Sequence, residues 1–326
     1  MGGDRAPGVI VRGVLDALRR SDLTVLLVGA ADVLAPEIPG LDQAVGDPIL
    51  SRLSIVDASD VIEMHESPLA ALRRKRHSSI RVAAELVASG RADALFSAGH
   101  SGATFLAAHA ALGTVPGVDR PALAVTVPTK SGATVLLDVG ANVECRPEHL
   151  AEFGRLGAAF VRATLEVEQP RVGLLSIGEE AGKGNDLVRE AYQRLMATSL
   201  NFIGNLEARD LFSGRADVVV CDGYTGNIAL KVGEGLAESM EDMIRETCGG
   251  VGGPQIDGLL TRLRQRIDYA EHGAAVLLGV AGLTLIGHGR SSSRAIESGV
   301  AMAARLVEGQ LMAKLRAEIA NAASEK

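Results

Sequence analysis

Residues 172–195 read VGLLSIGEEAGKGNDLVREAYQRL, and this stretch decides the fold that we expect. It opens with a short apolar run of the kind found in a buried parallel strand. A loop of glycines and charges follows at 178–186. Apolar residues then recur at helical spacing, and Asn185 or Asp186 stands where a side chain caps the first turn. The pattern predicts a strand, a glycine loop and a helix start in direct succession.

The loop at 178–186 suits an anion, because its N–H groups and the helix N-terminus point at one place. Lys183 stands between Gly182 and Gly184, so the backbone can approach a ligand while the ammonium group reaches over it. The loop is not a Walker A loop, since three residues separate Gly178 from Gly182 and Gly184 stands where Ser or Thr would bind magnesium. A surface loop with a solvated lysine is the alternative interpretation.

Composition limits the class of protein. The chain has 326 residues, 47% of them apolar, and a formal net charge of −7. This length suits one large α/β unit with a sizeable core. Aromatics are only 3%, which argues against stacking on single-stranded nucleic acid, so no nucleic-acid partner is expected. The three cysteines match no zinc spacing and no disulfide framework, which favours the cytoplasm, and the longest apolar run, 273–287, is too short to span a bilayer.

Two further strand-to-helix junctions carry glycines and polar side chains. The sequence SAGHSGAT follows a short expected strand at 97–104, and its hydroxyl residues suit a nest of N–H donors. The sequence CDGYTGN follows an expected strand at 221–227. Because the carboxyl ends of parallel strands meet at one edge, we expect these loops and the loop at 178–186 to form one pocket. Close helix–sheet packing is the alternative explanation for the glycines at 97–104.

The remaining pattern predicts an α/β fold with a mostly parallel sheet and helices on both faces, in a single unit over residues 1–326. Further strands are expected at 24–28, 53–56, 94–96, 123–127, 134–139, 201–205 and 218–220, and the strands at 123–127 and 134–139 are expected to be adjacent, as a hairpin around residues 130–132. Further helices are expected from Pro7, at 78–87, from Pro147, and from 291 to about 319. An amphipathic helical hairpin is expected at 228–268, which suits contact with a membrane surface or another protein. A surface helix docked on its own core is the alternative for that hairpin.

Seven motifs together closely resemble those of the bacterial phosphate acyltransferase family, which acts on acyl-acyl-carrier protein and phosphate. They stand in the family's order: MGGDRAP at 1–7, SAGHSGAT at 97–104, LLDVGANVEC at 136–145, IGEEAGKGND at 177–186, VVVCDGYTGNIALK at 218–231, RIDYAEHGAAVLLG at 266–279 and HG at 288–289. The resemblance implies a homodimer with a fold like that of phosphotransacetylases and isopropylmalate dehydrogenases.

The resemblance also implies an activity and its partners. Acyl-acyl-carrier protein and inorganic phosphate would give acyl phosphate, the first step toward phosphatidic acid and phospholipid. The acyl phosphate would pass to a membrane glycerol-3-phosphate acyltransferase, which implies a cytoplasmic protein with loose peripheral membrane association. No cofactor and no metal are implied.

Several positions depart from the family's pattern. A strand normally precedes residues 1–7, so either the start is called late or the sheet has one strand fewer. His100 replaces an asparagine, Gly287 replaces Ser or Ala before His288, and His272 stands where Tyr is common. The segment 249–258 is short and rich in glycine, which weakens the case for membrane docking through it.

The reaction assigns roles to the polar residues, because the enzyme must neutralise an anionic nucleophile and stabilise a tetrahedral oxyanion. We expect Lys183 and Asn227 to be catalytic, and His288 to protonate the leaving thiolate. Phosphate or the oxyanion would be bound by Ser97, Gly99, Ser101, Gly102, Gly182, Gly184, Asn185 and Thr225. Orientation of Lys183 and the loop amides, or a purely structural role, is expected for Asp4, Asp138, Asn142, Glu179 and Asp222.

A dense basic cluster is the best candidate for docking the acidic carrier protein, with a solvated helix end as the alternative. It comprises Arg73, Arg74, Lys75 and Arg76. Cys221 ends a strand, where a thiolate nucleophile is conceivable, but we favour a small buried hydrophobe. Two competing functions are a metal-dependent dehydrogenase of similar fold, which needs clustered aspartates, and a carrier-protein-binding regulator without activity.

Overall fold

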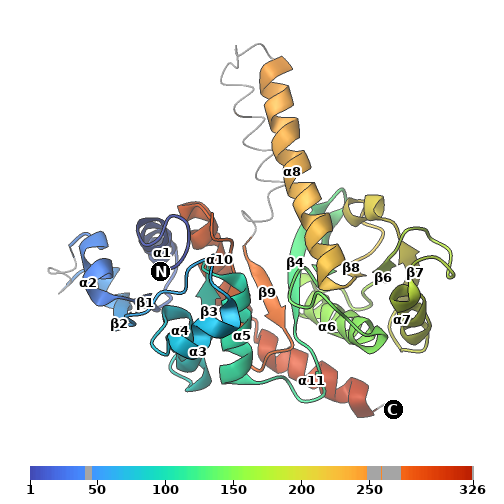
Figure 1. Cartoon of the computed structure of the whole chain (residues 1–326), viewed down its shortest axis with the longest axis horizontal. Helices are drawn as coiled ribbons and strands as arrows, with labels where there is room; N and C mark the ends of the chain where they lie inside the picture. Colours follow the sequence, from blue (N-terminus) through green and yellow to red (C-terminus); the bar gives the residue numbers. More distant parts are fainter. Residues whose placement is uncertain (41–45, 248–257, 259–272, 325–326) are drawn as a thin grey trace. The chain divides into compact units, whose positions relative to one another are not determined.

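The computed structural model describes residues 1–40, 46–247, 258 and 273–324 (Figure 1). The chain divides into two compact units, Met1–Pro121 with Gly273–Lys326, and Ala122–His272. The expectation of a single α/β unit over residues 1–326 stays a prediction. Of the hairpin expected at 228–268, the first arm is helical, and the rest lies outside the described residues apart from Gly258.

The first unit is built from short strands that alternate with helices. Its elements before Pro121 are α1 (Gly8–Arg20), β1 (Val25–Gly29), α2 (Ala31–Leu34), η1 (Ala35–Glu37), η3 (Leu50–Arg52), β2 (Leu53–Asp57), α3 (Pro68–Arg74), α4 (Ser79–Ala88), β3 (Ala94–Ser97) and α5 (Ser101–Leu112). Its elements after Gly273 are β9 (Ala275–Leu278), β10 (Leu283–Ile286), α10 (Ser293–Glu308) and α11 (Leu311–Ser324). Strands β1 and β2 pair in parallel. Strand β10 pairs in parallel with β3 on one side and antiparallel with β9 on the other.

Helices α1 and α10 lie side by side in this unit (Figure 1). They approach closely because Gly13 has no side chain: a Cβ there would lie 2.5 Å from the Cβ of Ile296. One face of α1 is apolar and packs into the core, where Val14 and Leu18 are buried against β1 and β2. This core therefore holds α1 and α10 beside the strands.

The second unit contains a longer run of paired strands than the first unit does. Its elements are β4 (Ala122–Thr129), β5 (Gly132–Leu137), α6 (Pro147–Leu165), β6 (Val172–Leu175), α7 (Asp186–Met196), β7 (Phe202–Leu206), η4 (Ala208–Phe212), β8 (Val218–Val220) and α8 (Gly223–Thr247). The strand order is β4-β5-β8-β6-β7. Strands β4 and β5 form the expected antiparallel hairpin, and the pairs β5–β8, β8–β6 and β6–β7 are parallel.

Strand β6 confirms the buried strand predicted from the apolar run that begins at Val172, since all four of its residues are buried. Ile177, which the prediction included in that run, lies beyond the strand and is 82% exposed. Helix α6 covers β8 closely, because a Cβ at Gly157 would lie 2.5 Å from Val218. The predicted strands are each found within a residue or two of their expected bounds. The expectation of an α/β fold with a mostly parallel sheet flanked by helices is confirmed.

One expected element is wrong in extent. The helix predicted from residue 291 to about 319 is two helices, α10 and α11. The break falls at Gly309 and Gln310, and Gln310 has φ of 54°. A residue in the left-handed region cannot continue a right-handed helix, so the chain turns there.

None of the described helices has the length and apolar character needed to cross a membrane.

Candidate active site

In the first unit, loops from three parts of the chain meet at the carboxyl ends of β3 and β10. The N–H of Asp4 donates to the carbonyl of Gly289 at 2.9 Å. The N–H of Gly287 donates to the carbonyl of Ser97 at 2.8 Å. Tertiary structure thus joins three of the motifs, those at 1–7, 97–104 and 288–289, as the parallel pairing of β3 with β10 requires.

The loop after β3 is held by its own side chains. Thr104 donates through its hydroxyl to Oγ of Ser97 at 3.0 Å, and the N–H of Gly99 donates to the same oxygen at 3.3 Å. The Nδ1 atom of His100 accepts from the N–H of Ala103 at 3.4 Å, so the imidazole caps α5. The departure at His100 is therefore accommodated, since a ring nitrogen takes the acceptor role that an amide oxygen would fill.

The two other expected residues at this helix start lie beside the cap. Ser101 begins α5 and is exposed, and Gly102 lies close to the His100 ring. His288 accepts at Nδ1 from the N–H of Arg290 at 3.4 Å, and its own N–H donates to the hydroxyl of Ser291 at 3.1 Å. These bonds fix the position of the imidazole at the end of β10.

In the second unit, Asp138 is the centre of the loop after β5. Its carboxylate accepts from N–H groups of Leu123 at 3.0 Å, Ala141 at 3.0 Å and Asn142 at 2.6 Å. It also accepts from Nδ2 of Asn142 at 3.0 Å and from the N–H of Gly140 at 3.2 Å. Burial raises the pKa of Asp138, and the hydrogen bonds from Ala141, Leu123 and Asn142 oppose this rise. Asp138 and Asn142 therefore shape this loop from within.

The start of α8 is locked against that loop. The N–H of Gly223 donates to the carbonyl of Asn142 at 2.8 Å. A Cβ at Gly226 would lie 1.9 Å from the carbonyl oxygen of Asp138, so only glycine fits. The junctions at 138–142 and 221–227 are thus one structure, as expected from the pairing of β5 with β8.

Asp222 caps α8, because its carboxylate accepts from both the N–H and the hydroxyl of Thr225, at 2.8 and 2.7 Å. Asn227 is exposed one turn further on, and its side chain lies beside Gly140. Thr225 and Asn227 therefore stand near the Asp138 loop, with the hydroxyl of Thr225 already engaged as a donor.

The loop after β6 has the predicted form. Asn185 caps α7, with its Oδ1 atom 2.9 Å from the N–H of Val188. Gly184 has φ of +98°, which a side chain would strain. Lys183 is exposed, and its stem lies across Gly178, with Cγ 3.0 Å from where a Cβ would stand. Gly182 is also exposed, so backbone and ammonium group are both accessible from solvent.

Sequence reasoning missed two residues that hold this loop. The Nδ2 atom of Asn205, in β7, donates to the carbonyl of Glu180 at 2.8 Å. Arg215 donates to Glu179 at 2.7 Å and pairs with Asp210 at 3.2 Å. Neither residue stands in a motif of its own. An Asn in an otherwise apolar strand is the only signal that the sequence offered.

Cys221 is 2% exposed, and its thiol donates to the carbonyl of Asp138. Burial, and then the charges of Asp222 and Asp138, raise the pKa of the thiol well above its usual value. A protonated, buried thiol is a poor nucleophile. The structure therefore favours the small buried hydrophobe over the thiolate.

The four residues of the basic cluster at 73–76 differ in their contacts. Arg74 and Lys75 both pair with Glu66, and Lys75 also donates to the carbonyl of Val61. Arg73 and Arg76 are exposed at the end of α3. The surface offered to an acidic partner is therefore smaller than the sequence suggests.

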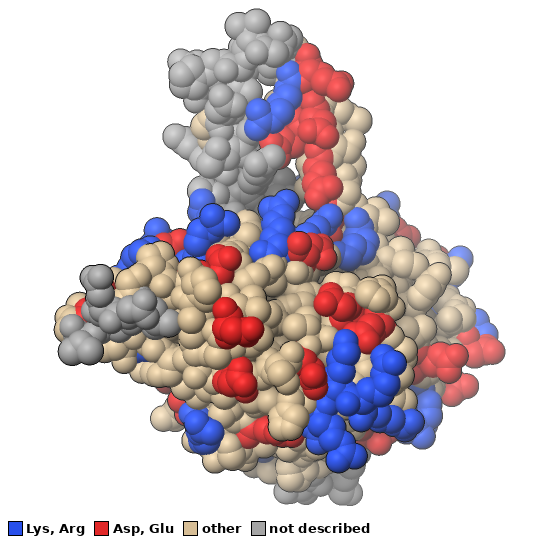
Figure 2. Space-filling model, turned by 60° about the vertical axis from the view of Figure 1, so that its left-hand side comes forward, with Lys and Arg blue, Asp and Glu red and all other residues tan. Residues whose placement is uncertain are grey.

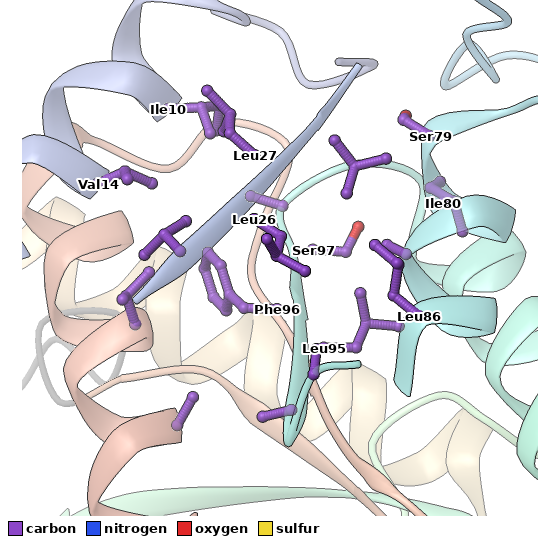
Figure 3. Close-up of a pocket in the computed structure, with 18 of the residues that line it drawn as sticks. Ile10, Val14, Leu26, Leu27, Ser79, Ile80, Leu86, Leu95, Phe96 and Ser97 are labelled. Carbon is purple, nitrogen blue, oxygen red and sulfur yellow. The ribbon is translucent and has the colours of Figure 1, made fainter. Parts of the chain in front are cut away.

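A cavity of about 520 Å³ lies in the first unit between β1 and β3 (Figure 3). Its wall is mainly apolar and includes Leu27 of β1, Leu95 and Phe96 of β3, Ile10 of α1 and Ile80 of α4. It reaches the candidate site at Gly2 and Gly3 of the first motif and at residues 97–99 after β3. A mainly apolar wall does not suit the binding of a phosphate ion.

Charge and metal-ligand chemistry add two observations on the described residues. Helix α8 carries a row of acidic side chains along its length (Figure 2), and its exposed acidic residues include Glu238, Asp242 and Glu246. In the described ranges no group of three or more His, Cys, Asp or Glu side chains is placed to hold a metal ion. In the second unit, Asp138 and Asn142 bond to each other and to backbone, and Asp222 bonds to Thr225. The expected convergence of all the loops in one pocket stays a prediction.

Comparison with known proteins identifies the family. A family model described as "Fatty acid synthesis protein" matches residues 1–314. A phosphate acyltransferase of Nitratidesulfovibrio vulgaris is 48% identical over 315 residues, covering 94% of this chain and 90% of the relative. One of Thermodesulfovibrio yellowstonii is 43% identical over 320 residues, covering 97% and 91%. The chain belongs to the phosphate acyltransferase family.

Membership of the phosphate acyltransferase family confirms that the chain is an enzyme, an acyltransferase of lipid synthesis. Solved structures show the same fold. A phosphotransacetylase from Streptococcus pyogenes aligns with a TM-score of 0.63 at 19% identity, covering 93% of this chain and 92% of its own. A branched-chain phosphotransacylase from Enterococcus faecalis aligns with a TM-score of 0.58 at 16% identity, covering 94% and 96%. The expected likeness to phosphotransacetylases is confirmed at the level of fold.

Proposed function

We propose that this chain transfers the acyl group of acyl-acyl-carrier protein to inorganic phosphate, and so supplies acyl phosphate for phosphatidic acid and phospholipid synthesis. The match to relatives named phosphate acyltransferase over 94–97% of the chain supports the proposal most strongly. The accessible Lys183 between two glycines, at the capped start of α7, supports phosphate as the acceptor.

The chemistry needs one nucleophile and one proton. A phosphate oxygen attacks the thioester carbon, and the tetrahedral oxyanion collapses as the C–S bond breaks. The acyl group leaves as acyl phosphate, and the carrier thiolate takes up a proton. The nucleophile is anionic from the start, so a covalent acyl-enzyme is unnecessary.

Roles follow from the contacts within each unit. In the second unit, Lys183 neutralises the phosphate, and the N–H groups of Gly182 and Gly184 add donors. Asn185 acts by capping α7, since its Oδ1 atom is taken by Val188. Asn227 is an uncharged donor at the start of α8, where Thr225 and Asp222 fix the first turn.

In the first unit, His288 is the acid. Its protonated imidazolium ring would give a proton to the leaving thiolate and so become the neutral ring, whose Nδ1 atom accepts from the N–H of Arg290 in the structure. Ser101 and Gly102 offer donors at the start of α5, and Ser97, Gly99 and Asp4 shape the loops beside them. Arg73 and Arg76 meet the acidic carrier protein.

The assay mixes the full chain with acyl-acyl-carrier protein and phosphate and follows two products, free thiol and acyl phosphate trapped with hydroxylamine. Both should appear in equal amounts and only when phosphate is present. Replacement of phosphate by sulfate is the matched control for ionic effects. Thiol release that is independent of phosphate would indicate a hydrolase and refute the proposal.

The assembly and the cellular location that the resemblance implies belong to the same proposal. We expect a homodimer that works in the cytoplasm and delivers acyl phosphate to a membrane glycerol-3-phosphate acyltransferase. Light scattering on the purified chain and flotation with phospholipid vesicles test these points. A monomer of full activity that never floats with vesicles would contradict them.

A further inference from the structure

The loop at 178–184 is anchored to the rest of the second unit through two adjacent glutamates. At Glu180 the anchor is the backbone, because Nδ2 of Asn205 donates to its carbonyl at 2.8 Å. The N–H of Lys183 donates to the same carbonyl at 2.9 Å, which closes a turn. Asn205 is only 3% exposed, so it is a rigid anchor. The position of Lys183 thus depends on a bond made by β7.

At Glu179 the anchor is the side chain. Arg215 donates to its carboxylate at 2.7 Å and also pairs with Asp210 at 3.2 Å. Asp210 is 8% exposed and accepts from the N–H of Glu207 at 3.2 Å, so it is fixed within η4. Arg215 therefore connects a carboxylate fixed in η4 to the glycine-rich loop at 178–184.

Charge gives Arg215 a second effect on the same loop. Glu179 and Glu180 place two carboxylates beside Lys183, and unpaired carboxylates would repel an incoming phosphate. Hydrogen bonds to Glu179 and then to Asp210 raise the pKa of Arg215, so its charge is permanent. The guanidinium group cancels the charge of Glu179 while holding it in place.

We propose that Arg215 is a positioning residue for phosphate: through Glu179 it fixes the loop that carries Lys183, and it removes one negative charge from the approach of the anion. This inference rests on the proposed function. It assigns no contact between Arg215 and the substrate, and it makes Arg215 a determinant of phosphate affinity more than of the bond-breaking step.

The test uses the full chain and separates binding from turnover. Arg215→Ala should raise KM for phosphate at least tenfold, with kcat and KM for acyl-acyl-carrier protein changed less than threefold. Arg215→Lys keeps the charge and should recover most of the phosphate affinity. Glu179→Gln should raise KM less, and in combination with Arg215→Ala should add little, because both substitutions break one connection.

Arg209→Ala is the matched control. Arg209 lies in η4, six residues from Arg215, and pairs with Glu207 at 2.8 Å rather than with the loop. Its substitution removes an equal charge and should leave KM for phosphate unchanged. An equal rise in KM for Arg209→Ala, or no rise for Arg215→Ala, would overturn the proposal.

A readout without substrate distinguishes failure of this inference from failure of the proposed function. Amide hydrogen exchange at residues 181–184 should be at least tenfold faster in Arg215→Ala than in the unchanged chain, with β6 and β8 protected as before. If exchange accelerates but no phosphate-dependent turnover exists, the connection stands and the proposed reaction is wrong. If exchange in the loop is unchanged, Arg215 does not position it.

Discussion

At Lys183 the stem of the side chain lies across Gly178 while the residue itself is exposed. The ammonium group therefore keeps its contact with water and remains accessible to an anion. In the proposed function its contribution is electrostatic, and an exposed side chain contributes little to folding.

Lys183→Ala should lower kcat/KM by about 10²–10³, the usual cost of losing one preorganised charge or donor. The melting temperature should stay within about 2 °C, because no buried contact is lost. Steady-state kinetics and thermal unfolding check both points. Lys130→Ala, at an exposed lysine of the β4–β5 hairpin in the same unit, should leave both unchanged. Near-normal turnover of Lys183→Ala would remove this residue from the mechanism.

Cys221 illustrates the opposite case, a reactive type of side chain kept inert by burial. Cys221→Ala should retain activity and cost on the order of 1 kcal/mol of stability. The folded thiol has a raised pKa, so its contribution to stability is complete below the unfolded pKa of about 8.5 and is lost as pH rises toward the folded value. The fall in melting temperature between pH 7 and pH 10 should therefore be smaller for Cys221→Ala than for the unchanged chain. Complete loss of activity in a folded Cys221→Ala would restore the thiolate hypothesis.

Among the elements, helix α8 shows why glycine is required at one position and replaceable at another. Gly226 faces the carbonyl oxygen of Asp138, whereas a Cβ at Gly235 would meet nothing within 4 Å. Both lie in the same helix, so they form a matched pair with identical chemistry and different surroundings.

Gly226→Ala should destabilise the protein by about 3 kcal/mol or more and lower activity, because the start of α8 must move away from the Asp138 loop. Gly235→Ala should be neutral or stabilising by up to about 1 kcal/mol, since alanine is the better helix former. Denaturant unfolding of both variants provides the comparison. Equal effects at the two sites would contradict the close approach of Gly226.

The cavity between β1 and β3 is bordered by strand edges, and no step of the proposed reaction uses it. In the described strands β1 pairs with β2 and β3 pairs with β10, so each presents an edge toward the cavity. Met1 lies against Gly29 at the end of β1, and Gly3 lies against Ala98 after β3. Burial lowers the pKa of the Met1 amino group, as expected for an ammonium group in an apolar place.

A run of five Val and Ile residues fused ahead of Met1 should raise the melting temperature and slow amide exchange in both β1 and β3, because it can pair with both edges. A Gly/Ser run of equal length should do neither. If the fusion precipitates, the same run is added in trans as an acetylated peptide and exchange is measured again. Equal behaviour of the apolar and Gly/Ser runs would show that the cavity does not accept a strand.

Over the whole molecule, a net charge of −7 opposes approach to an acidic carrier protein. If the proposed function holds, encounter with the carrier protein uses local positive charge. Arg73 and Arg76 are exposed, while Arg74 and Lys75 pair with Glu66. Such steering acts over a Debye length and fades with salt.

Arg73→Glu combined with Arg76→Glu should raise KM for acyl-acyl-carrier protein on the order of tenfold at low salt, with a smaller effect at high salt. Arg12→Glu combined with Arg19→Glu, on the exposed side of α1, makes the same change in net charge and should have little effect. KM measured against ionic strength distinguishes the pairs. An unchanged salt dependence in the first pair would place the docking surface elsewhere.

The sequence predicted the features that arise from neighbouring residues. Strand β6, its glycine loop and the Asn185 cap follow from residues within 15 positions of one another, so spacing and local hydrogen bonding suffice to predict them. The hairpin of β4 and β5 was predictable for the same reason. The break at Gly309 and Gln310 was missed, because the apolar spacing continues across a turn that only the backbone angle reveals.

What the sequence by itself determined is the α/β class, the strand–loop–helix junctions and, through its motifs, the phosphate acyltransferase family. Only the tertiary structure decided which side chains hold those junctions. Arg215 reaches Glu179 across 36 positions, Asn205 reaches Glu180 across 25, and Asp138 accepts from Leu123 across 15. The physical reason is that periodicity and capping are local properties, whereas a salt bridge or a buried hydrogen bond depends on where a parallel sheet brings distant residues together.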